Sequence, residues 1–130
     1  MKVLALDYGS ARTGVAVSDP TGTLARPLGT VEKVVEPDGF AKLLDVIRIE
    51  QPEKIVVGLP LTLRGERGEQ ARETDRFVAA LKDVLDVPVE TFDERFTTTL
   101  AGRSGTAPED ARAAAHLLSS YLEWSSRAAR

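Results

Sequence analysis

Short hydrophobic runs and longer amphipathic stretches alternate along the chain. Residues 3–6 and 54–60 form continuous apolar runs, which predict strands covered on both faces. Residues 14–18 follow the first run after a glycine turn and are predicted to form its hairpin partner. Residues 23–31 predict a weaker third strand, broken near Pro27, and residues 87–92 predict a last strand.

Three stretches place their apolar residues at helical spacing. They cover residues 40–47, residues 71–85 and a final segment from about 107 to 126. The first should begin just after Pro37-Asp38-Gly39, and the last carries Thr106-Ala107-Pro108-Glu109, which has the spacing of a capping box. The order β-β-β-α-β-α-β-α predicts an α/β fold. A three-strand antiparallel meander is followed by βα units, which together give a mixed sheet with helices on both faces.

Composition narrows the class of protein. A length of 130 residues predicts one domain, residues 1–130. The chain has no cysteine, no apolar run near the ~20 residues that cross a bilayer, and no signal peptide before its first strand, so we expect a cytoplasmic protein without membrane contact. Its net charge of −3 argues against binding nucleic acid by bulk charge. Any such contact should be local, carried by metal ions, or assisted by another protein.

Three acidic residues stand at the ends of predicted elements. Asp7 ends the first strand beside a glycine-bearing turn, Glu94 follows the last strand, and Asp110 lies in the first turn of the final helix. Ligands in α/β sheets tend to bind outside the carboxyl ends of strands, so the three could meet there. Asp93 rivals Glu94, because neighbouring strand residues face opposite ways.

Carboxylates gathered in this way repel one another and call for cations. Mg²⁺ or Mn²⁺ suits them, and two such ions ~3.5–4 Å apart can activate water and stabilise a leaving oxygen in phosphodiester cleavage. Each residue also has a simpler role open to it. Asp7 could cap a turn, Asp110 could interact with the helix dipole, and Glu94 could pair with Arg95.

Four blocks of sequence resemble one known family over nearly the whole chain. They are residues 6–16 (LDYGSARTGVA), 56–61 (VVGLPL), 93–98 (DERFTT) and 110–123. On these blocks the chain is similar to the YqgF family of ribonuclease-H-like nucleases, described both as Holliday junction resolvases and as pre-16S rRNA nucleases. The resemblance implies a ribonuclease-H-like, five-stranded mixed sheet, and it places Asp7, Glu94 and Asp110 at the family's acidic, metal-binding positions.

The resemblance also implies an activity. The expected protein is a metal-dependent hydrolase that trims the 5′ end of the 16S rRNA precursor during ribosome assembly. Two departures bear on substrate choice. Thr62 and Arg64 stand where the family commonly has Asn and an acidic or amide residue, and the segment between Arg95 and Asp110 is shorter than expected.

Five residues are candidates for contact with the substrate. Arg64 and Arg67 flank Gly65 on a loop and could bind phosphates, or could simply be solvated. Arg12 could steady a phosphate or pair with the acids, and Tyr8 beside Asp7 could stack on a base. Arg95, next to Glu94, completes the set.

The leading hypothesis is a nuclease acting on structured RNA as a monomer or weak homodimer, in contact with a ribosome precursor. One alternative keeps the fold and cuts four-way DNA junctions. Another is an rRNA- or ribosome-binding module without turnover. An actin-like ATPase shares the strand-Asp-x-Gly pattern, but 130 residues cannot supply its second lobe.

Overall fold

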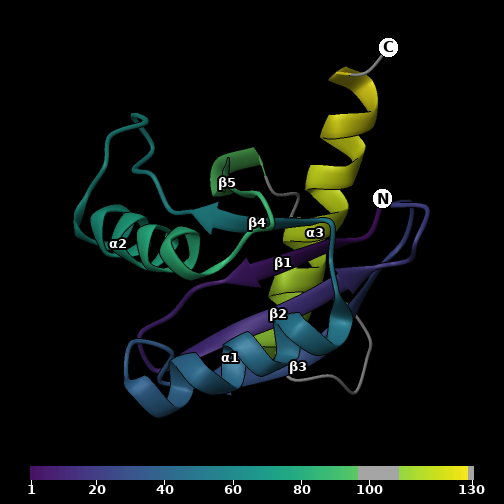
Figure 1. The fold of residues 1–130 in the computed structure, drawn as a ribbon. Coiled ribbons are helices and arrows are strands. Elements are labelled where there is room, and N and C mark those ends of the chain that lie inside the picture. Colours follow the sequence, from purple (N-terminus) through teal and green to yellow (C-terminus); the bar gives the residue numbers. More distant parts are fainter. Residues whose placement is uncertain (97–108, 129–130) are drawn as a thin grey trace.

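The computed structural model describes residues 1–96 and 109–128 and shows a five-stranded sheet between helices (Figure 1). The strands are β1 (Val3–Asp7), β2 (Arg12–Ser18), β3 (Ala25–Glu32), β4 (Lys54–Leu59) and β5 (Val89–Asp93). Their order across the sheet is β3-β2-β1-β4-β5. The first three pair antiparallel, and β4 pairs parallel with both β1 and β5. The predicted meander and mixed sheet are therefore confirmed.

Strand β3 differs from its predicted form. The sequence predicted a break near Pro27, yet Pro27 lies inside the strand and pairs with Ala16. Proline is tolerated there because β3 is an edge strand, where a missing N–H can face away from the sheet. The irregularity appears instead as a shift of register between Val15 and Ala16 on the partner strand.

Helices cover both faces of the sheet, as predicted. On one face α1 (Pro37–Glu50) and α2 (Glu69–Val84) pack against the even-numbered residues of β1, forming a core that includes Leu4, Leu6 and Leu43. On the other face α3 (Glu109–Ala128) packs against Val3 and Ala5. This division follows from the alternation of side chains along a strand. It also sends Asp7 to the α3 face.

Helix boundaries moved by a few residues from those predicted. Helix α1 begins at Pro37 rather than after Gly39, because proline's fixed φ suits the first helical position. Helix α3 continues to Ala128. The expected capping box and most of the short segment before Asp110 lie outside the described residues. Among the helices that the structure describes, none is long and apolar enough to cross a membrane.

Candidate active site

Asp7 ends the central strand of the sheet with a glycine on either side. Asp7 pairs with Gly14 on β2. On the other side, Leu6 pairs with Val57, so the neighbour of Asp7 on β4 is Gly58. Neither glycine has a side chain to fill the α3 face beside the carboxylate. Other groups can therefore pack against the backbone beside Asp7, and we call this place without side chains of its own, bounded by Gly14 and Gly58, the glycine hollow.

Glu94 reaches this hollow across an intervening strand. It begins a short 3₁₀ turn, Glu94–Phe96, directly after β5, and β4 separates β5 from β1. A Cβ added at Gly58 would lie 2.6 Å from Glu94 Oε1 and 3.0 Å from its Cγ. The Glu94 side chain therefore lies over Gly58, and any larger residue there would push it away from Asp7.

Asp110 approaches the hollow from the opposite side. A Cβ added at Gly14 would lie only 1.9 Å from the backbone oxygen of Asp110, so glycine at this position lets the first turn of α3 sit on β2. The Asp110 carboxylate accepts a 2.9 Å hydrogen bond from Arg12 Nε. Of the two roles proposed for Arg12, the structure shows the ion pair with the acids.

Electrostatics show that the acids act on one another. Burial raises the pKa of Asp7 above its ordinary value; a hydrogen bond with Glu94 lowers it, and the charge of Asp110 raises it. Burial and the charge of Asp7 raise the pKa of Glu94 to about 7. The hydrogen bond between the two carboxyl groups favours a proton on Glu94. Without a cation, two adjacent carboxylates share a proton because both cannot ionise cheaply.

The donor set fits a hard divalent cation, because all three side chains supply carboxylate oxygens. A raised pKa at two partly buried acids indicates a site short of positive charge. Within residues 1–96 and 109–128, however, no three Asp, Glu, His or Cys side chains are gathered closely enough to hold a metal ion. The ion pair with Arg12 holds the Asp110 carboxylate. A cation bound by all three acids would therefore require Asp110 to exchange Arg12 for the metal.

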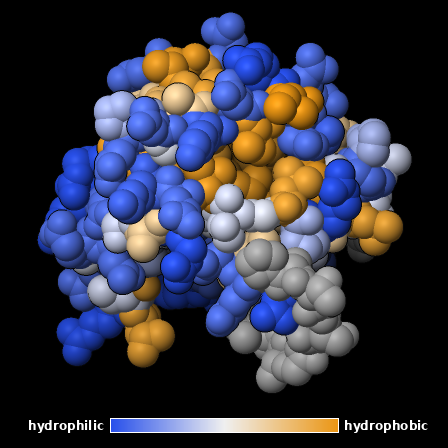
Figure 2. All heavy atoms as spheres, turned by 90° about the horizontal axis from the view of Figure 1, so that it is seen from below, coloured by the Kyte–Doolittle hydropathy of each residue, from blue (hydrophilic) through white to orange (hydrophobic). Residues whose placement is uncertain are grey.

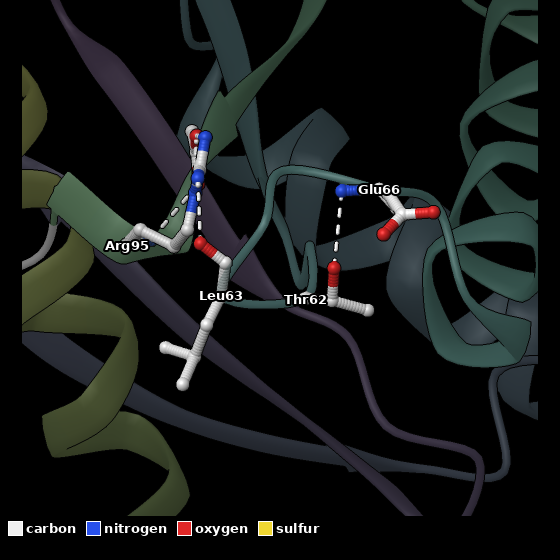
Figure 3. A network of polar contacts seen from close by, with 5 residues as sticks. Thr62, Leu63, Glu66 and Arg95 are labelled. Carbon is white, nitrogen blue, oxygen red and sulfur yellow. Dashed lines mark hydrogen bonds and ion pairs between the residues drawn. The ribbon is translucent and has the colours of Figure 1, made fainter.

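Asp93, the rival to Glu94, has a different partner. Its carboxylate binds the Arg95 guanidinium, with Nη2 2.6 Å from Oδ2, and this contact lowers the pKa of Asp93. Arg95 Nη1 also donates to the backbone oxygen of Leu63, 3.4 Å away (Figure 3). Arg95 thus ties the end of β5 to the loop after β4, rather than pairing with Glu94.

That loop contains the residues in which the sequence departs from the family pattern. Thr62 Oγ1 accepts a hydrogen bond from the Glu66 backbone N–H, 3.1 Å away, which closes the turn (Figure 3). Arg64 is exposed, and Arg67 forms a 3.0 Å ion pair with Asp75 on α2. Arg67 is therefore paired with an acid on α2, while Arg64 lies at the exposed surface of the loop.

Tyr8 extends the site around the end of β1. A cavity of about 160 Å³ is lined by Asp7, Glu94, Tyr8 and Glu73, together with Gly9, Ser10, Pro60, Gln70 and Thr74. The Tyr8 hydroxyl donates a 2.7 Å hydrogen bond to Glu73 Oε1. Burial and this carboxylate raise the pKa of Tyr8, so the phenol stays protonated at neutral pH.

A family model described as "RuvX: Holliday junction resolvase" matches residues 1–124. The chain belongs to the RuvX family. RuvX and YqgF denote the same family of nucleases, so the family and the enzyme class expected from the four blocks are confirmed.

Relatives of this RuvX protein are similar over most of their length. Three carry the name "Putative pre-16S rRNA nuclease". The protein from Roseiflexus sp. is 45% identical over 102 residues, 78% of this chain and 72% of the relative. The protein from Sulfurihydrogenibium sp. is 48% identical over 108 residues, 79% and 71% of the two chains. The protein from Syntrophomonas wolfei is 34% identical over 133 residues, 95% and 94% of the two chains.

Two solved structures share the fold of this chain. RuvC of Thermus thermophilus in complex with a Holliday junction substrate superposes with a TM-score of 0.59 at 20% identity, covering 95% of this chain and 96% of that one. A second RuvC structure from Thermus thermophilus gives 0.55 at 18% identity, covering 96% and 97%. The ribonuclease-H-like fold is therefore confirmed.

Two features of the site were not predicted from the sequence. Gly58 was assigned only to a buried strand, although a glycine inside a strand signals a close approach by another group. The sequence also carried no indication of strand order at this end of the sheet, where β4 lies between the strands that precede Asp7 and Glu94. Glu94 reaches Asp7 because Gly58 leaves its path open.

Proposed function

We propose that this RuvX protein is a metal-dependent phosphodiester hydrolase that processes the 5′ end of the 16S rRNA precursor in the cytoplasm, as a monomer or weak homodimer. The observation that carries the proposal is the meeting of Asp7 and Glu94 in the glycine hollow, with Asp110 close enough to raise the pKa of Asp7. The names of the relatives support the choice of an RNA precursor as substrate.

Asp7, Glu94 and Asp110 would hold one or two Mg²⁺ or Mn²⁺ ions. Bound there, such ions would supply a water molecule of lowered pKa and stabilise the oxygen that leaves the phosphate. Asp7 is the central ligand in this arrangement, because it contacts Glu94 and lies within the field of Asp110. Arg12 pairs with Asp110, and its guanidinium would also be placed to bind a phosphate oxygen of the substrate.

The test is cleavage of precursor 16S rRNA in the presence of Mg²⁺ or Mn²⁺. We expect cleavage by the natural protein and loss of at least about 100-fold in Asp7→Asn, since removing one group that stabilises the developing charge costs about this much. Asp45→Asn is the matched control, because Asp45 lies exposed on α1 in an ion pair with Arg48. Equal cleavage by the natural protein and Asp7→Asn would refute the proposal.

A second candidate is cleavage of four-way DNA junctions. The description of the family model favours it. Resolution of a junction needs two cuts, so this activity requires a dimer that persists on the substrate. Parallel assays with precursor rRNA and a synthetic junction, together with sedimentation of the protein, separate the two candidates. Preference for the junction by a stable dimer would replace RNA processing as the conclusion.

A binding module without turnover makes a different prediction about metal. Such a module has no need to bind Mg²⁺, whereas the proposed enzyme binds it through Asp7 and Glu94. Calorimetric titration with Mn²⁺ should give heat of binding in the natural protein and none in a Glu94→Gln variant. Tight RNA binding without a metal signal would favour the module.

A further inference from the structure

A second cavity adjoins the one that contains the acids. It measures about 340 Å³ and lies between the start of α1 and the middle of α2. Tyr8 and Glu73 line both cavities, so these two side chains form the boundary between them. We call the second cavity the aromatic groove, and its remaining lining includes Val34, Val35, Pro37, Phe40, Phe77 and Ala80.

The walls of the aromatic groove present flat aromatic surface. Tyr8 stacks on Phe77 with ring centroids 4.7 Å apart and planes inclined by 30°. Phe77 is buried, while Tyr8 and Phe40 are half-buried and therefore keep accessible surface. The hydrogen bond from Tyr8 to Glu73 fixes the orientation of the phenol ring. A planar ligand entering this groove would find a rigid aromatic surface already in place.

The charges around the groove select the kind of ligand. Glu36 and Glu73 are the carboxylates on its lining, and Arg76 is its cation, which also pairs with Glu69 on the same helix. Two carboxylates disfavour a phosphate group inside the groove but accept hydrogen bonds from amino groups. Glu73 can accept such a bond while it holds Tyr8, because a carboxylate has two oxygens.

We propose that the aromatic groove receives one unstacked, amino-bearing nucleobase of the RNA, from a nucleotide next to the phosphate held at the acids. The inference rests on the proposed nuclease function for the position of that phosphate. A base whose neighbouring phosphate lies at Asp7 would reach the groove around the end of β1, because Tyr8 is the next residue and forms a wall of both cavities. The volume lies at the small end of the about 300–1,000 Å³ typical of ligand pockets.

The lining of the groove includes exposed apolar surface. Figure 2 views the protein from below the orientation of Figure 1 and shows that hydrophobic residues on this face gather mostly at its centre and right, between hydrophilic ones. Val35, at the mouth of the groove, has 60% of its surface exposed. Exposed apolar surface beside a polar rim is typical of a binding site.

The experiment blocks the groove without touching the acids. Ala80→Trp places a large ring at an exposed position that lines the groove, and Ala79→Trp places the same ring at the neighbouring exposed position outside it. The probe is a fluorescent fragment of precursor 16S rRNA that spans the 5′ processing region, bound in the presence of Ca²⁺, which carboxylates also coordinate, and checked for intact length after each measurement. Each nucleotide is replaced in turn by an abasic residue, and thermal melting checks that both variants fold.

We expect one abasic position to weaken binding to the natural protein and to Ala79→Trp by about tenfold or more, the value of one stacked base. In Ala80→Trp the intact RNA should bind about tenfold more weakly, and the same abasic position should cost nothing further, because the two changes remove one interaction. Tyr8→Leu, which keeps an apolar side chain but removes the ring, should behave like Ala80→Trp. RNAs with guanine, adenine or cytosine at that position should bind more tightly than one with uracil.

Three results would overturn the inference. They are an abasic scan without any sensitive position, a sensitive position that remains equally sensitive in Ala80→Trp, and a natural protein that binds no RNA fragment. Failure of the nuclease proposal looks different. If the protein binds RNA with the expected base dependence but cleaves none with Mg²⁺ or Mn²⁺, the groove stands and the enzymatic proposal falls.

Discussion

Replacing Gly58 by alanine should disable the site while leaving all three carboxylates in the chain. The new Cβ would lie 2.6 Å from Glu94 Oε1, whereas ordinary contact begins at 3.4 Å. The Glu94 carboxyl group would therefore move by about 0.8 Å, and a misplacement of about 1 Å in a catalytic group costs about 100-fold in rate. We expect kcat for RNA cleavage to fall by about this factor.

The cost to the fold should be small, because the atoms nearest the new Cβ belong to the side chains of Glu94 and Leu117 rather than to backbone. Overpacking lowers the free energy of unfolding by about 1–3 kcal/mol. Alanine in place of glycine offsets about 0.5–1 kcal/mol of this, because the unfolded chain has less conformational freedom to lose. A net cost of about 1 kcal/mol lowers the melting temperature of a domain of this size by about 4 °C. Single-turnover cleavage and thermal melting measure the two effects separately.

A double variant and a control make this prediction sharper. Glu94→Asp shortens the displaced side chain by one methylene, so Gly58→Ala should cost less than about tenfold in that background. Gly68→Ala is the control, because the Cβ it adds meets only Thr62 Cγ2, at 3.8 Å. Full activity in the folded Gly58→Ala protein would refute the account of how Glu94 reaches Asp7.

Three further predictions follow from the same geometry. Because the folded-state pKa of Glu94 is raised from 4.5 to about 7, its contribution to stability is complete below pH 4.5 and is lost as pH rises through 7. Thermal melting in EDTA should therefore show the melting temperature falling between about pH 5 and 8. An equally steep fall in the melting temperature of a Glu94→Gln variant would contradict this. Arg12→Ala should free Asp110 and so tighten Mn²⁺ binding several-fold in calorimetry. The free energy of unfolding should fall by less than about 1 kcal/mol, because the ion pair is exposed. An unchanged Mn²⁺ affinity would show that the ion pair does not compete with metal. Gly14→Ala should lower the free energy of urea unfolding by about 3 kcal/mol or more, because the new Cβ would lie 1.9 Å from the backbone oxygen of Asp110 in α3. A loss below about 1 kcal/mol would mean that α3 can shift away from β2 at little cost.

The order of elements could be predicted because hydrophobic period and turn residues encode it locally. Asp7 could be predicted as a site residue for the same reason, since an acid after a buried strand needs a partner. Pairing across the sheet is different, because it depends on contacts between distant segments. The sequence could not show that β4 lies between β1 and β5, and so could not show that Gly58 opens the path of Glu94.

Side-chain partners were the hardest part of the site to predict. Asp93 and Glu94 are neighbours with the same charge, and only the turn after β5 turns one toward Arg95 and the other toward Asp7. Arg12 and Asp110 lie 98 positions apart, and their ion pair exists because Gly14 lets α3 settle on β2. Both outcomes follow from packing, which a linear pattern does not record.

The three acids come from the first strand, from the turn after the fifth strand and from the final helix. That helix also covers one whole face of the sheet, including Val3 and Ala5. Whenever α3 is undocked, the protein lacks both the cover for that face and the third carboxylate. Docking of α3 thus closes the core and brings the third acid to the site in a single step, so a change that loosens this helix should remove both at once.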